Sequence, residues 1–444
     1  MRKADEIEVP EHGAGMSTRS AHTLEAAEES KAQFEMEHIR LPDDLIPVPA
    51  ELPHEHPLPP ELMEEHFADT EMPEKESAAT LSQWQLIALR FSRHYLAVGS
   101  LFILMVLYSL AIFAEFAAPY TRGWSNVEMI YAPPQLPKFN FAHGLHVDRV
   151  ERRIDPITLK NYYLKTDAAV PLGFFVKGEP YHFWGLIPMD RHFFGVRTPL
   201  NPPLTRGEER GVGTFYFLGA DKYGRDILTR LIYGARISLS IGIVSIIATF
   251  ILGATIGGIS GYIGGTADTF IQRVIEVINS FPHLPLWLAF AAVLPSDWSP
   301  IQTYFAITIV LSLLGWTGLA RVVRGKILSL REEDYAVAAR LLGASHSRII
   351  FRHLLPGFSS HIIVSLSLSV PGMILGETAL SFLGLGLRPP VVSWGVMLQD
   401  ALNIDVVANY PWLLMPVVMI VFTVLAFNFF GDGMRDAADP YSSK

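Results

Sequence analysis

The chain has 444 residues, of which half are apolar and 18% are charged, and its mean hydropathy is +0.28. This composition excludes an ordinary soluble enzyme of several domains and indicates a protein that crosses a membrane several times. The lack of cysteine excludes disulfides, thiolate metal sites, iron–sulfur clusters and cysteine nucleophiles. The net charge of −9 is uneven, because the first eighty residues hold twenty acidic and six basic side chains.

Residues 1–80 form an acidic segment rich in proline, glutamate and histidine. Met1–Ser30 has no apolar core that would make it a cleavable signal peptide. The segment cannot bury enough apolar surface to fold alone, so we expect a disordered cytoplasmic tail. We interpret His54, His56 and His66 as solvated polar residues, with metal binding as the alternative.

Residues 81–118 contain a juxtamembrane segment and the first predicted transmembrane helix. The uncharged run within Leu96–Phe116 is long enough for a bilayer core, which needs about 20 residues. Arg90, Arg93 and His94 precede it. Because basic residues flank the cytoplasmic ends of membrane helices, the amino terminus is predicted to lie in the cytoplasm.

Residues 119–216 are a polar insertion with aromatic and proline-rich patches, such as Tyr181–Gly185. After a first span that leaves the cytoplasm, this insertion is predicted to be extracytoplasmic and to form a small folded cap. Its aromatic residues, including Trp184 and Phe193, are compatible with contact to a partner protein or with covering a pore.

Residues 217–444 contain five further apolar runs, which we interpret as transmembrane helices. The runs are Ile237–Ile259, Val274–Leu294, Ile301–Ala320, Ile362–Phe382 and Trp412–Phe430. The loop between the fourth and fifth spans is rich in arginine, whereas the outward loops 295–300 and 384–411 contain only Arg388. The positive-inside rule therefore predicts an all-α bundle of six spans with both termini in the cytoplasm.

A polar strip precedes the second span. Its candidate residues are Asp221, Gly224, Arg225, Asp226 and Arg230. Asp226 precedes Arg230 by four residues, a spacing at which opposite charges meet on one helical face. We expect this face to lie flat at the outer membrane interface, with a solvated turn as the alternative.

The loop 331–360 reads as two short helices that meet at a turn. Gly343 is the turn residue, because glycine adopts a left-handed conformation at no steric cost. Ala338 and Ala339 provide small faces for close approach, and Pro356 marks a helix start or break. An ordinary basic amphipathic loop is the alternative.

Small and polar residues within the spans suggest where helices meet. Gly253, Gly257, Gly261 and Gly265 recur at every fourth position, which permits close contact either inside the bundle or with another subunit.

Three polar residues within the predicted spans are costly in lipid, so Glu276, Asn279 and Glu377 should face protein or a water-filled path. For Glu377, a role in packing is an equal alternative. Pro371, followed by Gly372, implies a kink, which serves a gate or is a static bend.

The loop carries the most specific resemblance. The pattern Ala338-Ala339, three residues, Gly343, nine residues and then His353-Leu354-Leu355-Pro356 resembles the EAA loop of binding-protein-dependent ABC importer permeases. Val337 and His353 depart from the general pattern, which has Glu and Ile at these positions. The Glu is commonly absent from the peptide branch of the family.

Three further segments are similar to the oligopeptide and dipeptide permeases of the C type. They are Leu218–Leu239, Gly384–Leu387 and Gly431–Pro440. The resemblance is close over residues 217–441 and loose over residues 86–118, and it leaves out the tail and the insertion.

The resemblance implies a type I ABC importer permease, which forms half of a translocation pathway in the bacterial inner membrane. It implies a second homologous permease, two ATPase subunits, an extracytoplasmic substrate-binding protein and membrane lipid as partners, and no nucleic acid. The loop would dock on an ATPase, with these residues in the contact: Asp334, Tyr335, Ala338, Ala339, Gly343, Arg348, Leu355 and Pro356. Relatives of this type carry peptides, and others carry nickel, opines or oligosaccharides.

The chain is not predicted to be an enzyme. It lacks the Gly-x-x-x-x-Gly-Lys-Ser/Thr loop, because its one Gly325-Lys326 pair is followed by Ile327. ATP and magnesium are therefore expected on the partner subunits, with no cofactor in this chain. An ion-coupled secondary transporter would have repeated halves with two broken helices, and a membrane enzyme would have a converging catalytic constellation; the sequence indicates neither.

Overall fold

The computed structural model describes residues 82–141, 143–157, 161–197, 213–295 and 297–439. The expected tail, residues 1–80, lies outside these ranges. The α-helices are α4 (Gln83–Ser92), α5 (Tyr95–Ile112), α6 (Ala114–Ala117), α7 (Ile227–Ile263), α8 (Gly265–Asn279), α9 (His283–Ala292), α10 (Pro300–Leu330), α11 (Asp334–Leu341), α12 (His346–Arg348), α13 (Ser359–Phe382), α14 (Trp394–Met397), α15 (Ile404–Asn409) and α16 (Met415–Ala438).

Shorter helical turns and four strands complete the described chain. The turns are η1 (Val127–Met129), η2 (Ile349–Leu354), η3 (Leu355–Phe358), η4 (Leu398–Leu402) and η5 (Pro411–Leu414), and the strands are β1 (Lys138–Asn140), β2 (Gly144–Ile154), β3 (Asn161–Phe183) and β4 (Ile187–Val196).

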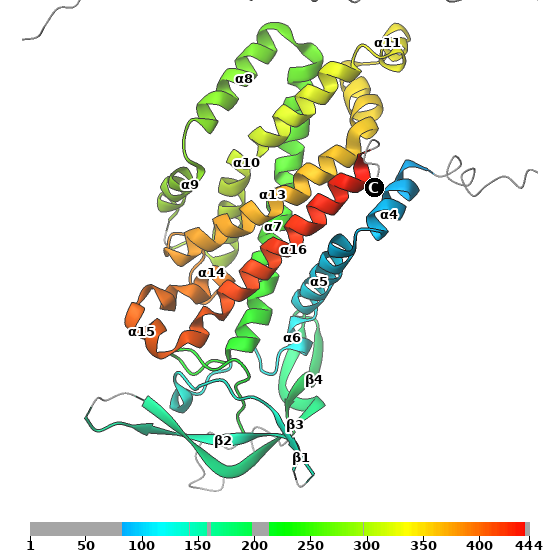
Figure 1. The fold of residues 1–444 in the computed structure, drawn as a ribbon. Coiled ribbons are helices and arrows are strands. Elements are labelled where there is room, and N and C mark those ends of the chain that lie inside the picture. Colours follow the sequence, from blue (N-terminus) through cyan, green and yellow to red (C-terminus); the bar gives the residue numbers. More distant parts are fainter. Residues whose placement is uncertain (1–81, 142, 158–160, 198–212, 296, 440–444) are drawn as a thin grey trace, which may run out of the picture. The chain divides into compact units, whose positions relative to one another are not determined.

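Five helical segments are long and apolar enough to cross a membrane (Figure 1). They are Tyr95–Ile112, Ile227–Ile263, Pro300–Leu330, His346–Phe382 and Pro411–Ala438. Each coincides with one of the predicted spans, although the first is shorter than predicted because α5 ends at Ile112 and α6 begins at Ala114.

The predicted span Val274–Leu294 is wrong as one continuous helix. The structure has α8 and α9 instead, bent by 84° at a break of no more than four residues. Pro282 lies in this break and disfavours helical geometry at Phe281, so the apolar run is divided. The pair counts as a sixth span only if the two bent halves cross together.

α7 and α10 pack closely, side by side (Figure 1). A Cβ built on Gly253 would lie 2.9 Å from Leu319, one on Gly257 would lie 2.4 Å from the backbone oxygen of Ala320, and one on Gly261 would lie 2.8 Å from that of Arg324. The first three glycines of the stripe therefore serve contact inside the chain. Gly265, whose Cβ would meet nothing within 4 Å, is not part of this contact.

α16 packs against α5 and α13. A Cβ on Gly431 would collide with Leu368 of α13, and one on Gly433 would collide with Ala97 of α5. An apolar core joins α5, α7, α13, α14 and α16 around the fully buried Trp394.

The insertion contains a four-stranded antiparallel sheet in the order β1-β2-β3-β4. The expectation of an all-α chain is therefore wrong for this region. The first half of the long strand β3 pairs with β2 and its second half pairs with β4. Val147, Val170 and Leu172 bury one face of the sheet against Phe215, which gives the two β-branched valines the packed surface that strands require.

Candidate functional site

The loop after α10 has the predicted helix–turn–helix form. α11 ends at Leu341, Gly343 follows with φ +79°, and the chain resumes as α12, η2 and η3 up to the start of α13. The side chain of Ser345 accepts a hydrogen bond from the backbone N–H of Arg348 at 3.4 Å and caps the second helix. A Cβ on Gly343 would meet no atom within 4 Å, so the positive φ alone favours glycine there.

One face of this loop is anchored on the bundle. Ala336, Ile349 and Leu354 are buried in an apolar cluster with residues of α7 and α10, among them Tyr262 and Ile327. The Arg340 guanidinium lies 5.8 Å from the centre of the Tyr262 ring and donates a hydrogen bond to the Arg331 oxygen. The loop is therefore positioned by packing on both long helices.

The opposite face of the loop is exposed. Leu341 and Leu342 at the end of α11 are 83% and 88% exposed, and Tyr335 is 45% exposed. Two adjacent leucines in water are costly unless another surface covers them. The sequence prediction did not name these leucines, although their position directly before Gly343 was a usable signal.

The predicted loop residues divide between the two faces. Leu355 is buried and Ala339 is half-buried against the apolar cluster, whereas these residues are exposed: Asp334, Tyr335, Ala338, Gly343, Arg348 and Pro356. The structure thus brings the predicted set into one segment, and most of its members face outward.

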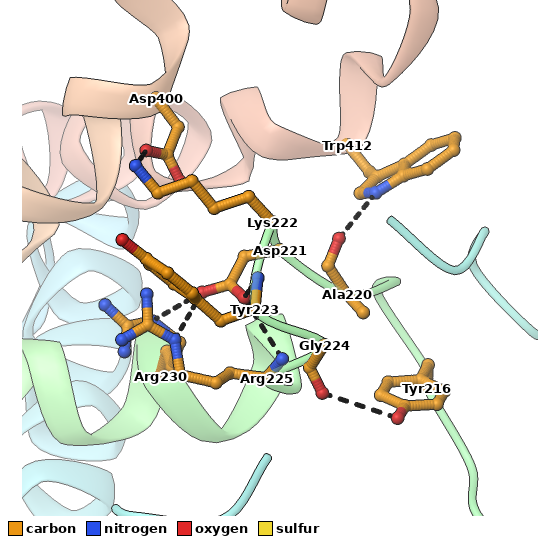
Figure 2. A network of polar contacts seen from close by, with 10 residues as sticks. All are labelled: Tyr216, Ala220, Asp221, Lys222, Tyr223, Gly224, Arg225, Arg230, Asp400 and Trp412. Carbon is orange, nitrogen blue, oxygen red and sulfur yellow. Dashed lines mark hydrogen bonds and ion pairs between the residues drawn. The ribbon is translucent and has the colours of Figure 1, made fainter. Parts of the chain in front are cut away.

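The polar strip before α7 folds into a compact turn around Asp221 (Figure 2). The Asp221 carboxylate accepts hydrogen bonds from the backbone N–H groups of Tyr223 at 2.8 Å and Arg225 at 3.1 Å. It also accepts one from Arg225 Nε at 2.7 Å and lies 3.5 Å from Arg230 Nε. Gly224 has φ +68°, and a Cβ there would lie 1.7 Å from the Asn126 oxygen, so no other residue fits.

The expected pairing of Asp226 with Arg230 is wrong. Asp226 is the N-cap of α7, and its carboxylate accepts a hydrogen bond from the backbone N–H of Thr229 at 2.7 Å, while Arg230 pairs with Asp221. A capping side chain turns back toward the first helical N–H groups and so cannot face the next turn. Both residues are buried, so the strip does not lie flat on a membrane interface.

The turn is also bonded to the segment that precedes α16. Lys222 Nζ lies 2.9 Å from Asp400 Oδ1, and Trp412 Nε1 donates a hydrogen bond to the Ala220 oxygen at 3.1 Å (Figure 2). The sequence prediction missed Asp400 and Trp412, because no pattern relates them to a strip so far away in the chain. The cavity beside this network has a volume of about 50 Å³, which has room for water but not for a solute.

Burial sets the acidity of Asp226. Removal from water raises the pKa of its carboxyl to about 7, against the opposing effect of its hydrogen bonds from Thr229. One carboxyl oxygen, Oδ1, is buried and has no hydrogen-bond partner within the part of the chain that the structure describes. The charge of Asp221 also raises this pKa, and Tyr120 and Tyr216 are close enough to interact with Asp226 electrostatically.

The four candidate path residues have separate surroundings. Glu276 is exposed and pairs with Arg273 at 2.6 Å, and the Asn279 side-chain oxygen accepts a hydrogen bond from Thr317 at 3.0 Å. Pro371 is buried within α13, which runs through it without a break. The structure therefore does not bring these residues together into one site.

Glu377 is fully buried and joins three segments. It accepts hydrogen bonds from Ser238 of α7 at 3.2 Å and from Ser381 of α13 at 2.9 Å. Ser238 Oγ in turn accepts the backbone N–H of Trp394, the first residue of α14, at 3.1 Å. This arrangement supports the interpretation of Glu377 as a packing residue. Among the described residues, no group of three or more His, Asp or Glu side chains could hold a metal ion.

These features define a polytopic membrane protein: the helices are long and apolar, buried hydrogen bonds join them, and one loop is packed on the bundle with its other face exposed. Residues 253–443 match the family model of the binding-protein-dependent transport system inner membrane component, and residues 82–134 match the N-terminal transmembrane domain of oligopeptide transport permease C. The chain belongs to the family of binding-protein-dependent inner-membrane permeases, in its oligopeptide permease C branch.

Curated relatives support this assignment. The dipeptide transport system permease protein DppC of Bacillus subtilis (strain 168) is 39% identical over 225 residues, which are 51% of this chain and 68% of that protein. The oligopeptide transport system permease protein OppC of Haemophilus influenzae is 41% identical over 228 residues, 51% and 70% of the two chains. The glutathione transport system permease protein GsiD of Pectobacterium atrosepticum is 37% identical over 281 residues, 63% and 88% of the two chains.

Proposed function

We propose that this permease forms half of the translocation pathway of an ATP-driven importer of peptides or related small solutes. The observation that supports this most strongly is the match to peptide permeases across the membrane core. Relatives named for dipeptide, oligopeptide and glutathione transport are 37–41% identical there. The lack of a phosphate-binding loop in the sequence supports the proposal that partner subunits hydrolyse ATP. The second permease and a substrate-binding protein complete the proposed assembly.

The proposed topology has six spans, of which the third is the bent pair α8 and α9. Residues 1–80 and the carboxy terminus lie in the cytoplasm, residues 81–118 carry the first span, residues 119–216 are extracytoplasmic, and residues 217–444 form the permease core. The arginines of the loop 331–360 and of the end of α10 support this orientation.

The loop 331–360 is the proposed contact with the ATPase. Its buried face holds it on α7 and α10, while Leu341 and Leu342 project from the end of α11 without cover from the described residues. An apolar projection of this kind fits a cleft on a partner, because burial of two leucine side chains stabilises a contact by about 3 kcal/mol or more. Because the loop is packed on α7 and α10, a displacement of α11 would also move these two helices.

Reconstitution tests this function directly. The chain is co-purified with its partner subunits and its binding protein, placed in liposomes, and tested for uptake of a labelled dipeptide and tripeptide with ATP, without ATP, and with an imposed ion gradient alone. We expect uptake that requires ATP and the binding protein. Uptake driven by the ion gradient alone would contradict the proposal in favour of a secondary transporter.

A further inference from the structure

The turn between β3 and β4 has an unusual residue at its tip. Trp184 and Gly185 both have positive φ, +53° and +74°, and the N–H of Leu186 donates a hydrogen bond to the Phe183 oxygen at 3.0 Å. Two successive turn positions at positive φ favour Asn-Gly, because a large side chain is strained at positive φ. Strain of this kind persists where the surroundings hold the residue for another purpose.

The Trp184 side chain is bonded to the end of the first membrane helix. Its indole Nε1 donates a hydrogen bond to the Ile112 oxygen, the last residue of α5, at 3.0 Å. The Arg236 guanidinium lies 5.2 Å from the centre of the indole ring, donates to the Ala111 oxygen at 2.8 Å and pairs with Glu115 at 2.6 Å. The tip of the hairpin is therefore fixed at the level where α5 ends.

The residues after Trp184 are apolar and exposed, as are many side chains of α5. Leu186 and Ile187 are 82% and 57% exposed, and Phe183 stacks on Phe113 with ring centres 5.9 Å apart. Large apolar side chains of α5, among them Phe102, are also exposed and have the lipid around them as their natural environment. Ile112 and Phe113, at the end of α5 that the tip contacts, are exposed as well (46% and 50%).

The middle of the same hairpin carries an exposed ion pair. Lys177 of β3 pairs with Asp190 of β4 at 3.2 Å, and both side chains are exposed. Tryptophan is a residue that proteins place at membrane interfaces, where its apolar ring and its polar N–H group are both satisfied. The hairpin thus has an apolar tip at the end of a span and an exposed ion pair midway along its strands, while Phe174 and Phe175 near its base are also exposed.

We propose that the tip of the β3–β4 hairpin, Trp184–Ile187, inserts into the bilayer interface beside α5 and anchors the sheet to the lipid. Interfacial segments bury their apolar face by about 5–10 Å at the boundary between headgroups and acyl chains. This inference rests on α5 as a membrane span and does not depend on the solute that the permease carries. The occupant of the exposed tip is lipid, and a partner subunit at the same place is an outcome of the test.

The cysteine-free sequence allows a direct test. Leu186→Cys is compared with Ile157→Cys, a similarly exposed apolar residue (89%) in the turn after β2. The full chain, with its co-purifying subunits, is labelled with an environment-sensitive maleimide dye in nanodiscs of phosphatidylethanolamine and phosphatidylglycerol. Quenching is measured with a lipid that carries a doxyl group near the headgroup and with iodide in water.

We expect the dye at position 186 to show several-fold stronger quenching by the doxyl lipid than the dye at position 157, and weaker quenching by iodide. Equal iodide quenching at both positions would place the tip in water and overturn the proposal. A dye at 186 that is shielded from iodide but not quenched by the doxyl lipid would show that a protein partner covers the tip, which also overturns it.

A second variant tests the role of the indole. Trp184→Asn, combined with Leu186→Cys, keeps a residue that suits positive φ and so retains the turn, but removes the hydrogen bond to Ile112 and the contact with Arg236. We expect the doxyl quenching at position 186 to fall severalfold. Unchanged quenching would overturn Trp184 as the anchor.

Discussion

Lys222 Nζ and Asp400 Oδ1 lie 2.9 Å apart and join the turn before α7 to η4, the segment that leads to α15 and α16. The hydrogen bond from Lys222 to Asp400 raises the pKa of Lys222. The lysine is thus charged at neutral pH, and the stability that its raised pKa contributes would be lost as the pH rises through that pKa.

The first prediction concerns the strength of this pair. The Lys222 side chain is 42% exposed and that of Asp400 is 16% exposed, so solvent screens their attraction. A double-mutant cycle with Lys222→Gln and Asp400→Asn should give a coupling free energy of about 0.5–1 kcal/mol. The coupling is measured from thermal unfolding in detergent and should shrink at high salt. A coupling that is independent of salt would contradict the interpretation of a screened surface pair.

The second prediction concerns the buried N-cap Asp226, whose pKa is raised from 3.8 to about 7. Between these two values the unfolded carboxyl is ionised and the folded one is protonated, so rising pH favours unfolding. Wild-type stability should fall relative to Asp226→Asn by up to about 1 kcal/mol per pH unit across this window and then level off. Asparagine caps helices as well as aspartate does, so the helix start is kept.

Melting temperatures of the two proteins from pH 4 to pH 8 test this. The asparagine variant should be the more stable one above pH 7. Parallel curves would show that Asp226 is ionised throughout. Asp226→Ala, which lacks the cap, should be about 1 kcal/mol less stable than the asparagine variant at every pH.

The third prediction concerns the close contact of α7 with α10. Gly257→Ala places a methyl group 2.4 Å from the Ala320 oxygen, so the helices must separate, at a cost of about 1–3 kcal/mol. Gly318→Ala on α10 is the matched control, because its Cβ meets nothing within 4 Å. Thermal unfolding in detergent should show a loss for the first variant only. Equal stability of both would mean that the helices are not in contact at Gly257.

The fourth prediction concerns Gly343. Gly343→Asp and Gly343→Asn should strain the turn to a similar extent, since Asn and Asp are the residues that tolerate a left-handed conformation at about 1–2 kcal/mol or less. Only the aspartate would bring a carboxylate into the proposed ATPase contact, where an unpaired charge costs several kcal/mol more. We expect solute uptake at background and weaker co-purification of the ATPase for the aspartate variant, with a melting temperature equal to that of the asparagine variant.

The asparagine variant should retain much of the uptake. If Gly343→Asp transports at the wild-type rate, the loop is not the coupling element. If its expression collapses, the glycine serves folding instead.

The fifth prediction concerns topology. Asp297 and Ser345 lie beyond opposite ends of α10, whose 31 residues extend over about 46 Å. The single variants Asp297→Cys and Ser345→Cys should react with a membrane-impermeant maleimide from opposite sides, and only the thiol at position 297 should be accessible from outside in intact cells. Labelling of both from outside would contradict the six-span arrangement.

The positions of the long helices could be predicted, because apolar runs of bilayer length leave few alternatives to a helix. The left-handed turn at Gly343 was also predictable, since Gly343 is the only glycine between Asp334 and Pro356 and glycine adopts this conformation without strain. Both depend on local sequence alone.

The remaining features depend on contacts between distant residues. Asp226 was assigned to Arg230 by spacing, but Asp221 competes for the arginine once the turn forms, and only the fold brings them together. The sheet was missed because its strands alternate irregularly around bulges at Asp148/Val150 and Lys177/Tyr181. The break of the third span follows from Pro282. This proline is a local signal, but the high hydropathy of the run around it favoured the prediction of one continuous helix.

The glycine contacts between α7 and α10 leave these helices no freedom to slide past or roll over one another. Their backbones meet at Gly257 and Gly261 with no side chain between them to repack, so the two helices form a single stiff beam. The loop 331–360 is packed onto one end of this beam, and the Asp221 turn precedes the other end, about 56 Å away along the 37 residues of α7. A rotation imposed at the loop would therefore turn α7 and α10 together as a rigid body and displace the Lys222–Asp400 ion pair. Any bending of the subunit would occur in its other helices.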